Sequence, residues 1–168
     1  MGFKAVVITI SDRGSRGERK DTSGPEIVGM LQQIGMEIIG LQIIPDEKEL
    51  IRRSLIEWSD VEKTDLILTT GGTGVSPRDV TPDATREVID REIPGMAEAM
   101  RLESLQRTPF AMLSRAVVGA RGRTLIINLP GSPKAALENF QTAKPVLEHA
   151  VKLLKDYPDS EQGHLVTK

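Results

Sequence analysis

The sequence predicts an α/β fold, a three-layer sandwich in which a mostly parallel central sheet carries helices on both faces. Three observations lead to this prediction. Several short segments are apolar or β-branched at nearly every position, as strands buried on both faces are. Stretches with apolar residues at helical spacing alternate with these segments. Clusters of Gly, Pro, Asp and Ser separate the two kinds of segment, as expected for turns between strands and helices.

The predicted strands are rich in Val, Ile and Leu, which favour extended backbone. A polar loop, residues 11–23, follows the first strand, and residues 119–123 join the last two. We expect strands at residues 5–10, 37–44, 66–69, 116–118 and 124–127.

Helices are predicted between the strands from their periodicity and their end signals. Pro25 suits the first turn of a helix, where its missing N–H has no partner, and Gly35 suits the position just after that helix ends. Asp46 is a candidate cap for a second helix, and Asp83 is the favoured cap of a helix that runs through Val88 and Ile89. The second helix would carry one apolar face made of Leu50, Ile51, Leu55 and Ile56. Further helices are expected at residues 96–105, 133–140 and 144–154.

Composition restricts the class of protein. The 168 residues predict a single domain, residues 1–168, with a flexible tail at 158–168. The absence of cysteine excludes disulfides, thiolate zinc sites and cysteine nucleophiles. A net charge of −2 and 3% aromatic residues argue against nucleic acid as a partner. No stretch is long and apolar enough for a membrane span, and the first residues do not form a signal peptide, so a cytoplasmic location is expected.

Polar turns follow four of the predicted strands. The carboxyl ends of parallel strands meet at one edge of a sheet, which is where open α/β folds bind ligands. The four turns therefore predict one shared site, and they comprise residues 11–14, 45–47, 71–74 and 130–134.

The turn at residues 71–74, Gly-Gly-Thr-Gly, is the strongest candidate for a phosphate-binding loop. Glycines allow close backbone approach and can direct several N–H groups toward an anion, although a plain turn is the alternative. A P-loop is excluded because no lysine follows Gly74. The dinucleotide fingerprint is excluded because no third glycine opens a helix.

Asp46 and Asp79 are predicted to lie at the same sheet edge. Two carboxylates beside a phosphate loop repel an anionic ligand unless a cation lies between them, and Mg²⁺ is bound in this way by carboxylates and substrate phosphates. The combination predicts nucleotidyl or phosphoryl transfer. Asp46 keeps a second interpretation as a helix cap.

The turn after the last strand adds a second anion site. Ser132 as a cap and Pro133 in the first helical turn would leave helix-terminal N–H groups facing a ligand. Asn128 either hydrogen-bonds a heterocycle or satisfies the end of its strand, and the two interpretations have equal weight.

Six short motifs together resemble the molybdopterin-binding Mog/MoaB family over residues 4–154. The Ile-Pro-Asp-Glu at residues 44–47 and the Asp-Val-Thr-Pro at residues 79–82 resemble its adenylyltransferase branch, whereas the Asp-Thr-Ser-Gly at residues 21–24 resembles the MoaB-type branch equally well. The six motifs lie at residues 10–13, 21–25, 69–74, 78–85, 113–115 and 129–134.

The resemblance implies a reaction in which ATP adenylylates the terminal phosphate of molybdopterin and pyrophosphate leaves. It implies that Asp46 and Asp79 are the catalytic residues and hold Mg²⁺. It also implies a homotrimer and a downstream molybdenum-insertion protein as partner. The alternative is a non-catalytic molybdopterin-binding or scaffold protein of the MoaB type. The residues expected to bind substrate are Ser11, Asp12, Thr70, Gly71, Gly72, Thr73, Gly74, Thr81, Ser114, Asn128, Pro130, Gly131 and Ser132.

Overall fold

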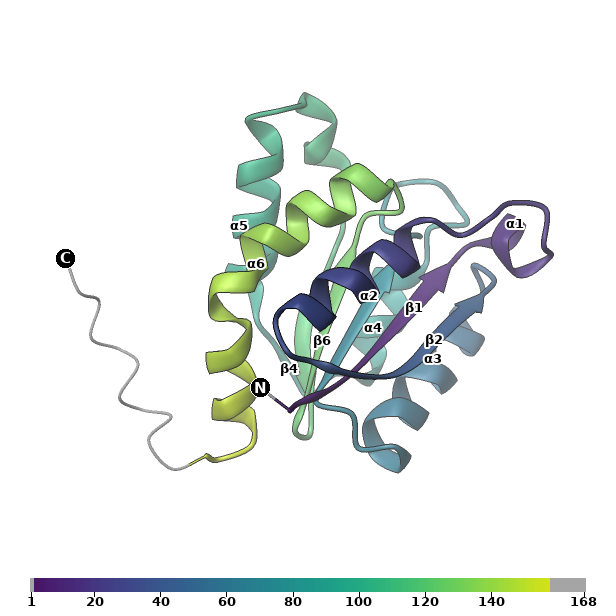
Figure 1. Cartoon of the computed structure of the whole chain (residues 1–168). Coiled ribbons are helices and arrows are strands. Elements are labelled where there is room, and N and C mark those ends of the chain that lie inside the picture. Colours follow the sequence, from purple (N-terminus) through teal and green to yellow (C-terminus); the bar gives the residue numbers. More distant parts are fainter. Residues whose placement is uncertain (1, 158–168) are drawn as a thin grey trace.

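A computed structural model describes residues 2–157 and shows one six-stranded sheet between two layers of helices (Figure 1). The strand order is β2-β1-β3-β6-β5-β4; the first four strands in this order are parallel to one another, and β5 and β4 are antiparallel additions. The predicted α/β class and mostly parallel sheet are therefore confirmed. The tail predicted at residues 158–168 lies outside the described residues. The strands are β1 (Lys4–Ile10), β2 (Glu37–Ile44), β3 (Leu66–Thr70), β4 (Arg91–Glu92), β5 (Val118–Arg121) and β6 (Thr124–Leu129).

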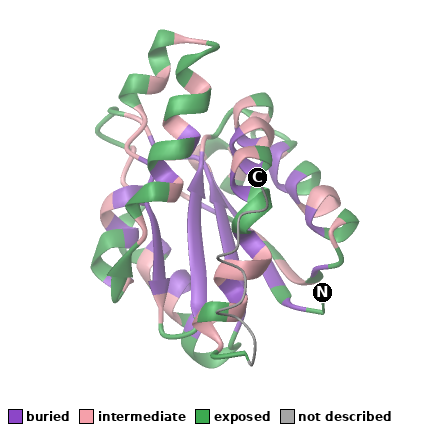
Figure 2. Ribbon diagram, turned by 90° about the vertical axis from the view of Figure 1, so that its left-hand side faces the viewer, coloured by how far each residue is buried: buried purple, intermediate pink, exposed green. Residues whose placement is uncertain are grey.

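The helices divide between the two faces of the sheet. One apolar cluster joins the sheet to α2, α5 and α6, and a second joins the opposite face to α3 and α4. Alternation along β1 explains the division, because Val7 points into the first cluster and Val6 and Ile8 into the second. Figure 2 shows the buried strands between the layers. The α-helices are α1 (Asp12–Ser15), α2 (Ser23–Gln33), α3 (Lys48–Ile56), α4 (Thr81–Val88), α5 (Pro94–Leu105) and α6 (Pro133–Leu154), with a π-type turn η1 (Glu57–Val61) and a 3-10 turn η2 (Pro109–Leu113).

Several element predictions need correction. The two helices predicted at residues 133–140 and 144–154 form the single helix α6, which contains Pro145 and bends midway in Figure 1. It continues because Phe140 and Leu147, on either side of the proline, bury against the same cluster. In α3, Leu50 is exposed rather than part of the buried face. The strand predicted at residues 116–118 begins at Val118, and β4 was not predicted.

A glycine ends helix α2. Gly35, directly after the last turn of α2, has a φ of 77°, a left-handed conformation that side chains with a Cβ rarely adopt. This turn leads the chain into β2, whose observed bounds equal the predicted residues 37–44. Among residues 2–157, no helix is long and apolar enough to cross a membrane.

Candidate active site

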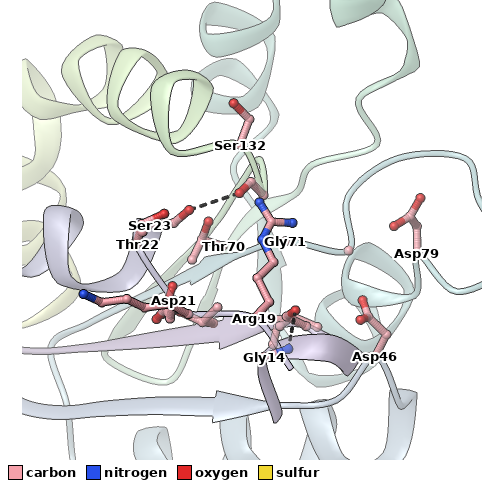
Figure 3. Close-up of a pocket in the computed structure, with 16 residues that line it drawn as sticks. Gly14, Arg19, Asp21, Thr22, Ser23, Asp46, Thr70, Gly71, Asp79 and Ser132 are labelled. Carbon is pink, nitrogen blue, oxygen red and sulfur yellow. Dashed lines mark hydrogen bonds between the residues drawn. The ribbon is translucent and has the colours of Figure 1, made fainter. Parts of the chain in front are cut away.

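The loops that follow β1, β2, β3 and β6 meet at the carboxyl edge of the sheet and enclose a hollow of about 440 Å³ (Figure 3). This arrangement brings together the four turns that the sequence predicted. The hollow is lined by Thr9, Ile10, Ser11, Gly14, Arg19, Lys20, Asp21, Thr22, Ser23, Asp46, Thr70, Gly71, Gly72, Asp79, Gly131 and Ser132.

The glycine loop after β3 has a backbone that only glycine adopts easily. Gly71 and Gly72 have φ values of 106° and 65°. A Cβ on Gly71 would collide with the backbone oxygen of Ile10, and one on Gly72 with the hydroxyl of Thr81. No hydrogen bond among the described residues uses the N–H groups of Gly72, Thr73 and Gly74. The loop therefore presents free donors, as an anion-binding nest requires.

Thr81 supports this loop from behind. It is fully buried at the start of α4, and its hydroxyl donates to the carbonyl of Gly71 at 3.0 Å. Its backbone N–H donates to the carbonyl of Gly72 at 3.1 Å. The sequence predicted Thr81 as a substrate contact, but it does not line the hollow; its contacts fix the glycine loop instead.

Asp46 turns toward the hollow because it is not the cap of α3. That helix begins at Lys48 with Glu47 as its N-cap residue. The Asp46 carboxylate accepts a hydrogen bond from the N–H of Asp12 at 2.9 Å, and the Asp12 carboxylate accepts one from the N–H of Asp46 at 3.0 Å. Partial burial raises the pKa of Asp46 above its ordinary value, and the negative charges of Asp12 and Asp79 add to this rise.

Arg78 neutralises Asp12. Its guanidinium donates two hydrogen bonds to the Asp12 carboxylate, at 2.8 and 3.0 Å, and these lower the pKa of Asp12. Asp12 was predicted at the rim of the site, yet it is not among the residues that line the hollow. Its carboxylate joins Arg78 to the N–H of Asp46, so it positions other residues.

Asp79 lies on the same side of the hollow as Asp46 (Figure 3). One carboxylate oxygen accepts from the N–H of Ser76 at 2.8 Å, and the backbone carbonyl accepts from Arg115 at 3.1 Å. Arg115 also forms an ion pair with Asp83 at 2.6 Å. Asp83 was predicted as a helix cap; α4 begins two residues earlier, so Asp83 lies in its first turn and holds Arg115 instead.

The turn after β6 closes the hollow opposite the two carboxylates. Gly131 packs against Gly71, and its carbonyl accepts a hydrogen bond from the hydroxyl of Ser23 at 3.0 Å. Ser132 is the N-cap residue of α6, as predicted, but its side chain makes no capping hydrogen bond. Its hydroxyl and the first N–H groups of α6 are therefore available at the hollow.

Asn128 has the structural role that the sequence left open. It is fully buried in β6, and its amide donates to the hydroxyls of Thr69 and Thr85, both at 3.0 Å. Its side-chain oxygen accepts from the N–H of Val117 at 3.2 Å. The amide of Asn128 is thus used inside the protein, and Asn128 lines neither this hollow nor the second one described below.

Comparison with known proteins places the chain in a family. A family model described as a probable molybdopterin binding domain matches residues 6–149. The chain belongs to this family.

Relatives of the family resemble the chain along most of its length. The molybdenum cofactor synthesis protein cinnamon of Drosophila melanogaster is 47% identical over 152 residues, which cover 89% of this chain but 25% of cinnamon. The chain thus spans about a quarter of that relative. The molybdopterin adenylyltransferase of Haemophilus influenzae is 46% identical over 144 residues, 84% of this chain and 73% of that protein. The crystal structure of the molybdopterin biosynthesis enzyme MoaB from Thermus thermophilus superimposes with a TM-score of 0.86 at 52% identity, covering 93% of this chain and 98% of that one.

In this molybdopterin-binding domain, the predicted substrate residues divide between two hollows. Eight predicted site residues line the first hollow: Ser11, Asp46, Thr70, Gly71, Gly72, Asp79, Gly131 and Ser132. A second hollow of about 250 Å³ is lined by the predicted residues Thr73, Gly74, Ser114 and Pro130, together with Arg101, Ser104, Thr108, Phe110, Ala111, Leu113, Ala135 and Asn139. The glycine loop contributes residues to both hollows: Gly71 and Gly72 to the first, and Thr73 and Gly74 to the second.

The loop between α1 and α2 also contributes to the first hollow, which was not predicted from the sequence. Arg19, Lys20 and Thr22 from this loop line the first hollow, as does Asp21. The Asp21 carboxylate accepts from the hydroxyl of Thr9 at 2.7 Å and from the N–H of Gly24 at 3.1 Å. In the sequence, the motif at residues 21–25 indicates this loop, because the motif is one of the six that resemble the family and its first three residues line the hollow.

Proposed function

We propose that this chain transfers the AMP group of Mg-ATP to the terminal phosphate of molybdopterin and releases pyrophosphate. Relatives named molybdopterin adenylyltransferase, 41–46% identical over 82–88% of the chain, support this reaction. The observation that carries the proposal is the position of Asp46 and Asp79, on one side of a hollow whose other walls include the glycine loop and the start of α6.

The charges of Asp46 and Asp79 fit a bound Mg²⁺. Arg78, which lies near Asp46, is paired with Asp12 and forms no ion pair with Asp46 or Asp79. Hard carboxylate oxygens are the ligands that Mg²⁺ prefers. Among residues 2–157, no group of three or more acidic or histidine side chains forms a complete metal site, so phosphate oxygens of the nucleotide would supply further ligands. When bound there, Mg²⁺ would neutralise charge on the reacting phosphates.

The neutral donors of the site would hold phosphate oxygens. Gly72, whose N–H has no partner among the described residues, and Ser132 line the first hollow from two different loops. An oxygen of the molybdopterin phosphate attacks the α-phosphorus of ATP, and the bond to the bridging oxygen breaks as pyrophosphate leaves. The attacking phosphate is already ionised at neutral pH, so the step needs no general base.

We assign the pterin to the second hollow, with its phosphate directed across the glycine loop into the first. Phe110 and Leu113 give this hollow apolar walls, and Ser114 and Asn139 add polar groups. A few polar groups among apolar walls are typical of sites for a planar heterocycle. Thr73 and Gly74 line the second hollow while Gly71 and Gly72 line the first, so one loop would contact both parts of the same substrate.

A pterin-binding scaffold without turnover is the second candidate function. It is favoured by the Asp-Thr-Ser-Gly at residues 21–24, which resembles the MoaB-type branch of the family. Incubation with molybdopterin and Mg-ATP, followed by mass analysis of the pterin, separates the two. Adenylylated pterin and pyrophosphate support the enzyme, and binding without product supports the scaffold.

The proposal also covers the oligomeric state of the protein, its location and its partner. We propose a homotrimer in the cytoplasm that passes its product to a molybdenum-insertion protein, as the family resemblance implies. Exposed apolar side chains on α5 and η2 outside the second hollow, among them Leu102 and Met112, support a surface that is covered in an oligomer.

A further inference from the structure

Two cations of the first hollow have no partner among residues 2–157. Arg19 and Lys20 lie in the loop between α1 and α2 and line the hollow, and both are exposed. Among the described residues, neither side chain forms an ion pair or a hydrogen bond. Arg16, in the same loop, is instead paired with Glu18 at 2.8 Å. The hollow therefore contains two positive charges that no ion pair within the described part of the chain engages.

The loop that carries these cations is anchored beside them. The Asp21 carboxylate accepts hydrogen bonds from the Thr9 hydroxyl and the Gly24 N–H, so it ties the loop to β1 and α2 and is not paired with Arg19. Figure 3 shows the Arg19 side chain extending into the hollow, apart from Asp46 and Asp79. Arg19 thus lies in a different part of the hollow from Asp46 and Asp79.

We infer that Arg19, assisted by Lys20, binds the pyrophosphate part of the nucleotide, the group that leaves in the reaction. This inference rests on the proposed function. A nucleoside triphosphate has its α-phosphate at one end of a chain that carries several negative charges. If the α-phosphate reacts near Asp46 and Asp79, the terminal phosphates extend away from these carboxylates and meet the unpaired cations.

The chemistry of the step gives the cations a role in turnover as well as in binding. As the pterin phosphate forms its bond to the α-phosphorus, the bond to the bridging oxygen breaks and its electron pair moves to the departing pyrophosphate. A positive charge near that oxygen stabilises the charge that develops on it. A guanidinium suits this position because it donates two parallel hydrogen bonds to phosphate oxygens and stays protonated.

Inorganic pyrophosphate provides a probe that does not depend on catalysis. Its affinity is measured by isothermal titration calorimetry on the full chain without Mg²⁺ or pterin. We expect Arg19→Ala to weaken binding about tenfold, since one charge-assisted interaction is lost, and Arg19→Lys to retain part of the affinity. Arg16→Ala removes the same charge from the same loop outside the hollow and should leave the affinity unchanged.

Steady-state kinetics of AMP transfer, measured beside pyrophosphate binding, distinguish failure of this inference from failure of the proposed reaction. Arg19→Ala should raise the KM for ATP while the affinity for molybdopterin stays at its wild-type value. If Arg19→Ala, Lys20→Ala and the double variant all bind pyrophosphate as wild type does, the inference is overturned, even if AMP transfer proceeds. If pyrophosphate binds in an Arg19-dependent way but no AMP is transferred, the anion site stands and the proposed reaction fails.

Discussion

Asp46 and Asp12 each accept a hydrogen bond from the other's backbone N–H, at 2.9 and 3.0 Å. This exchange joins the end of β1 to the end of β2 and fixes the Asp46 carboxylate at the hollow. Arg78 completes the arrangement by binding both oxygens of Asp12. The residue proposed to bind the metal is therefore held in place by a second carboxylate and by an arginine from a separate loop.

Arg78→Ala tests this arrangement. Without the guanidinium, the pKa of Asp12 returns toward its ordinary value and the loop that carries Asp79 loses its link to β1. Residues that orient metal ligands typically contribute roughly tenfold in metal affinity, so we expect the Mg²⁺ concentration for half-maximal AMP transfer to rise about tenfold. The melting temperature should hardly change because the Arg78 side chain is 59% exposed. Arg53→Ala, which breaks an exposed ion pair on α3, is the matched control, and an equal effect there would contradict the prediction.

Asp46→Asn should not lower stability at neutral pH. Burial and neighbouring negative charges raise the pKa of Asp46, so its ionised form is less stable in the folded state than in the unfolded chain. Asparagine removes the charge and keeps an oxygen that accepts from the Asp12 N–H. We expect a melting temperature at pH 7 equal to or above that of wild type. The difference should shrink toward about pH 4, where protonation of Asp46 removes the same charge in wild type.

Calorimetric melting curves at the two pH values provide this measurement. Glu62→Gln, a substitution at an exposed surface carboxylate, serves as the control and should leave the melting temperature unchanged at both. A variant at position 46 that melts well below wild type at pH 7 would show that the carboxylate stabilises the fold.

Ser114→Trp tests the assignment of the pterin to the second hollow. The indole would fill much of a space of about 250 Å³, so molybdopterin binding should weaken by at least roughly tenfold. ATP binding, which we place in the first hollow, should remain within about twofold of wild type. Gln106→Trp adds the same side chain at an exposed position outside both hollows. Fluorescence titrations with each substrate check the result, and unchanged pterin affinity in Ser114→Trp would contradict the assignment.

Light scattering tests the assembly. The homotrimer implied by the family should have about three times the 18.4 kDa mass of the chain. The exposed Leu102 and Met112 make a stable monomer less favourable because they would leave apolar surface in water. A mass of one chain across micromolar concentrations would contradict the trimer.

Features that depend on local sequence could be predicted well. The β2 strand has the expected bounds, and the four loops lie at one edge of the sheet because parallel strands leave no alternative. The continuous α6 helix was missed because Pro145 is locally a helix breaker, whereas burial of Phe140 and Leu147 is a property of the tertiary structure.

Side-chain roles that depend on partners distant in sequence could not be predicted. From the sequence alone, Asn128 fits a ligand contact and a structural role equally well. The structure decides for the structural role, because the hydroxyls of Thr69 and Thr85 accept its amide protons. The sequence around Asp46 fits a helix cap. In the structure its carboxylate instead accepts a hydrogen bond from the N–H of Asp12, 34 residues away. Arg19 lies in a polar loop without periodicity, and only the folded chain places it at the hollow.

The most direct test of the central claim compares wild type with Asp46→Asn and Asp79→Asn in two assays, molybdopterin binding and Mg-dependent AMP transfer. Each substitution keeps the side-chain shape and removes one charge and one hard oxygen ligand. We predict that both variants bind molybdopterin with wild-type affinity and transfer AMP roughly 10²–10³ times more slowly. Transfer at the wild-type rate by either variant would show that the carboxylate pair does not carry the reaction.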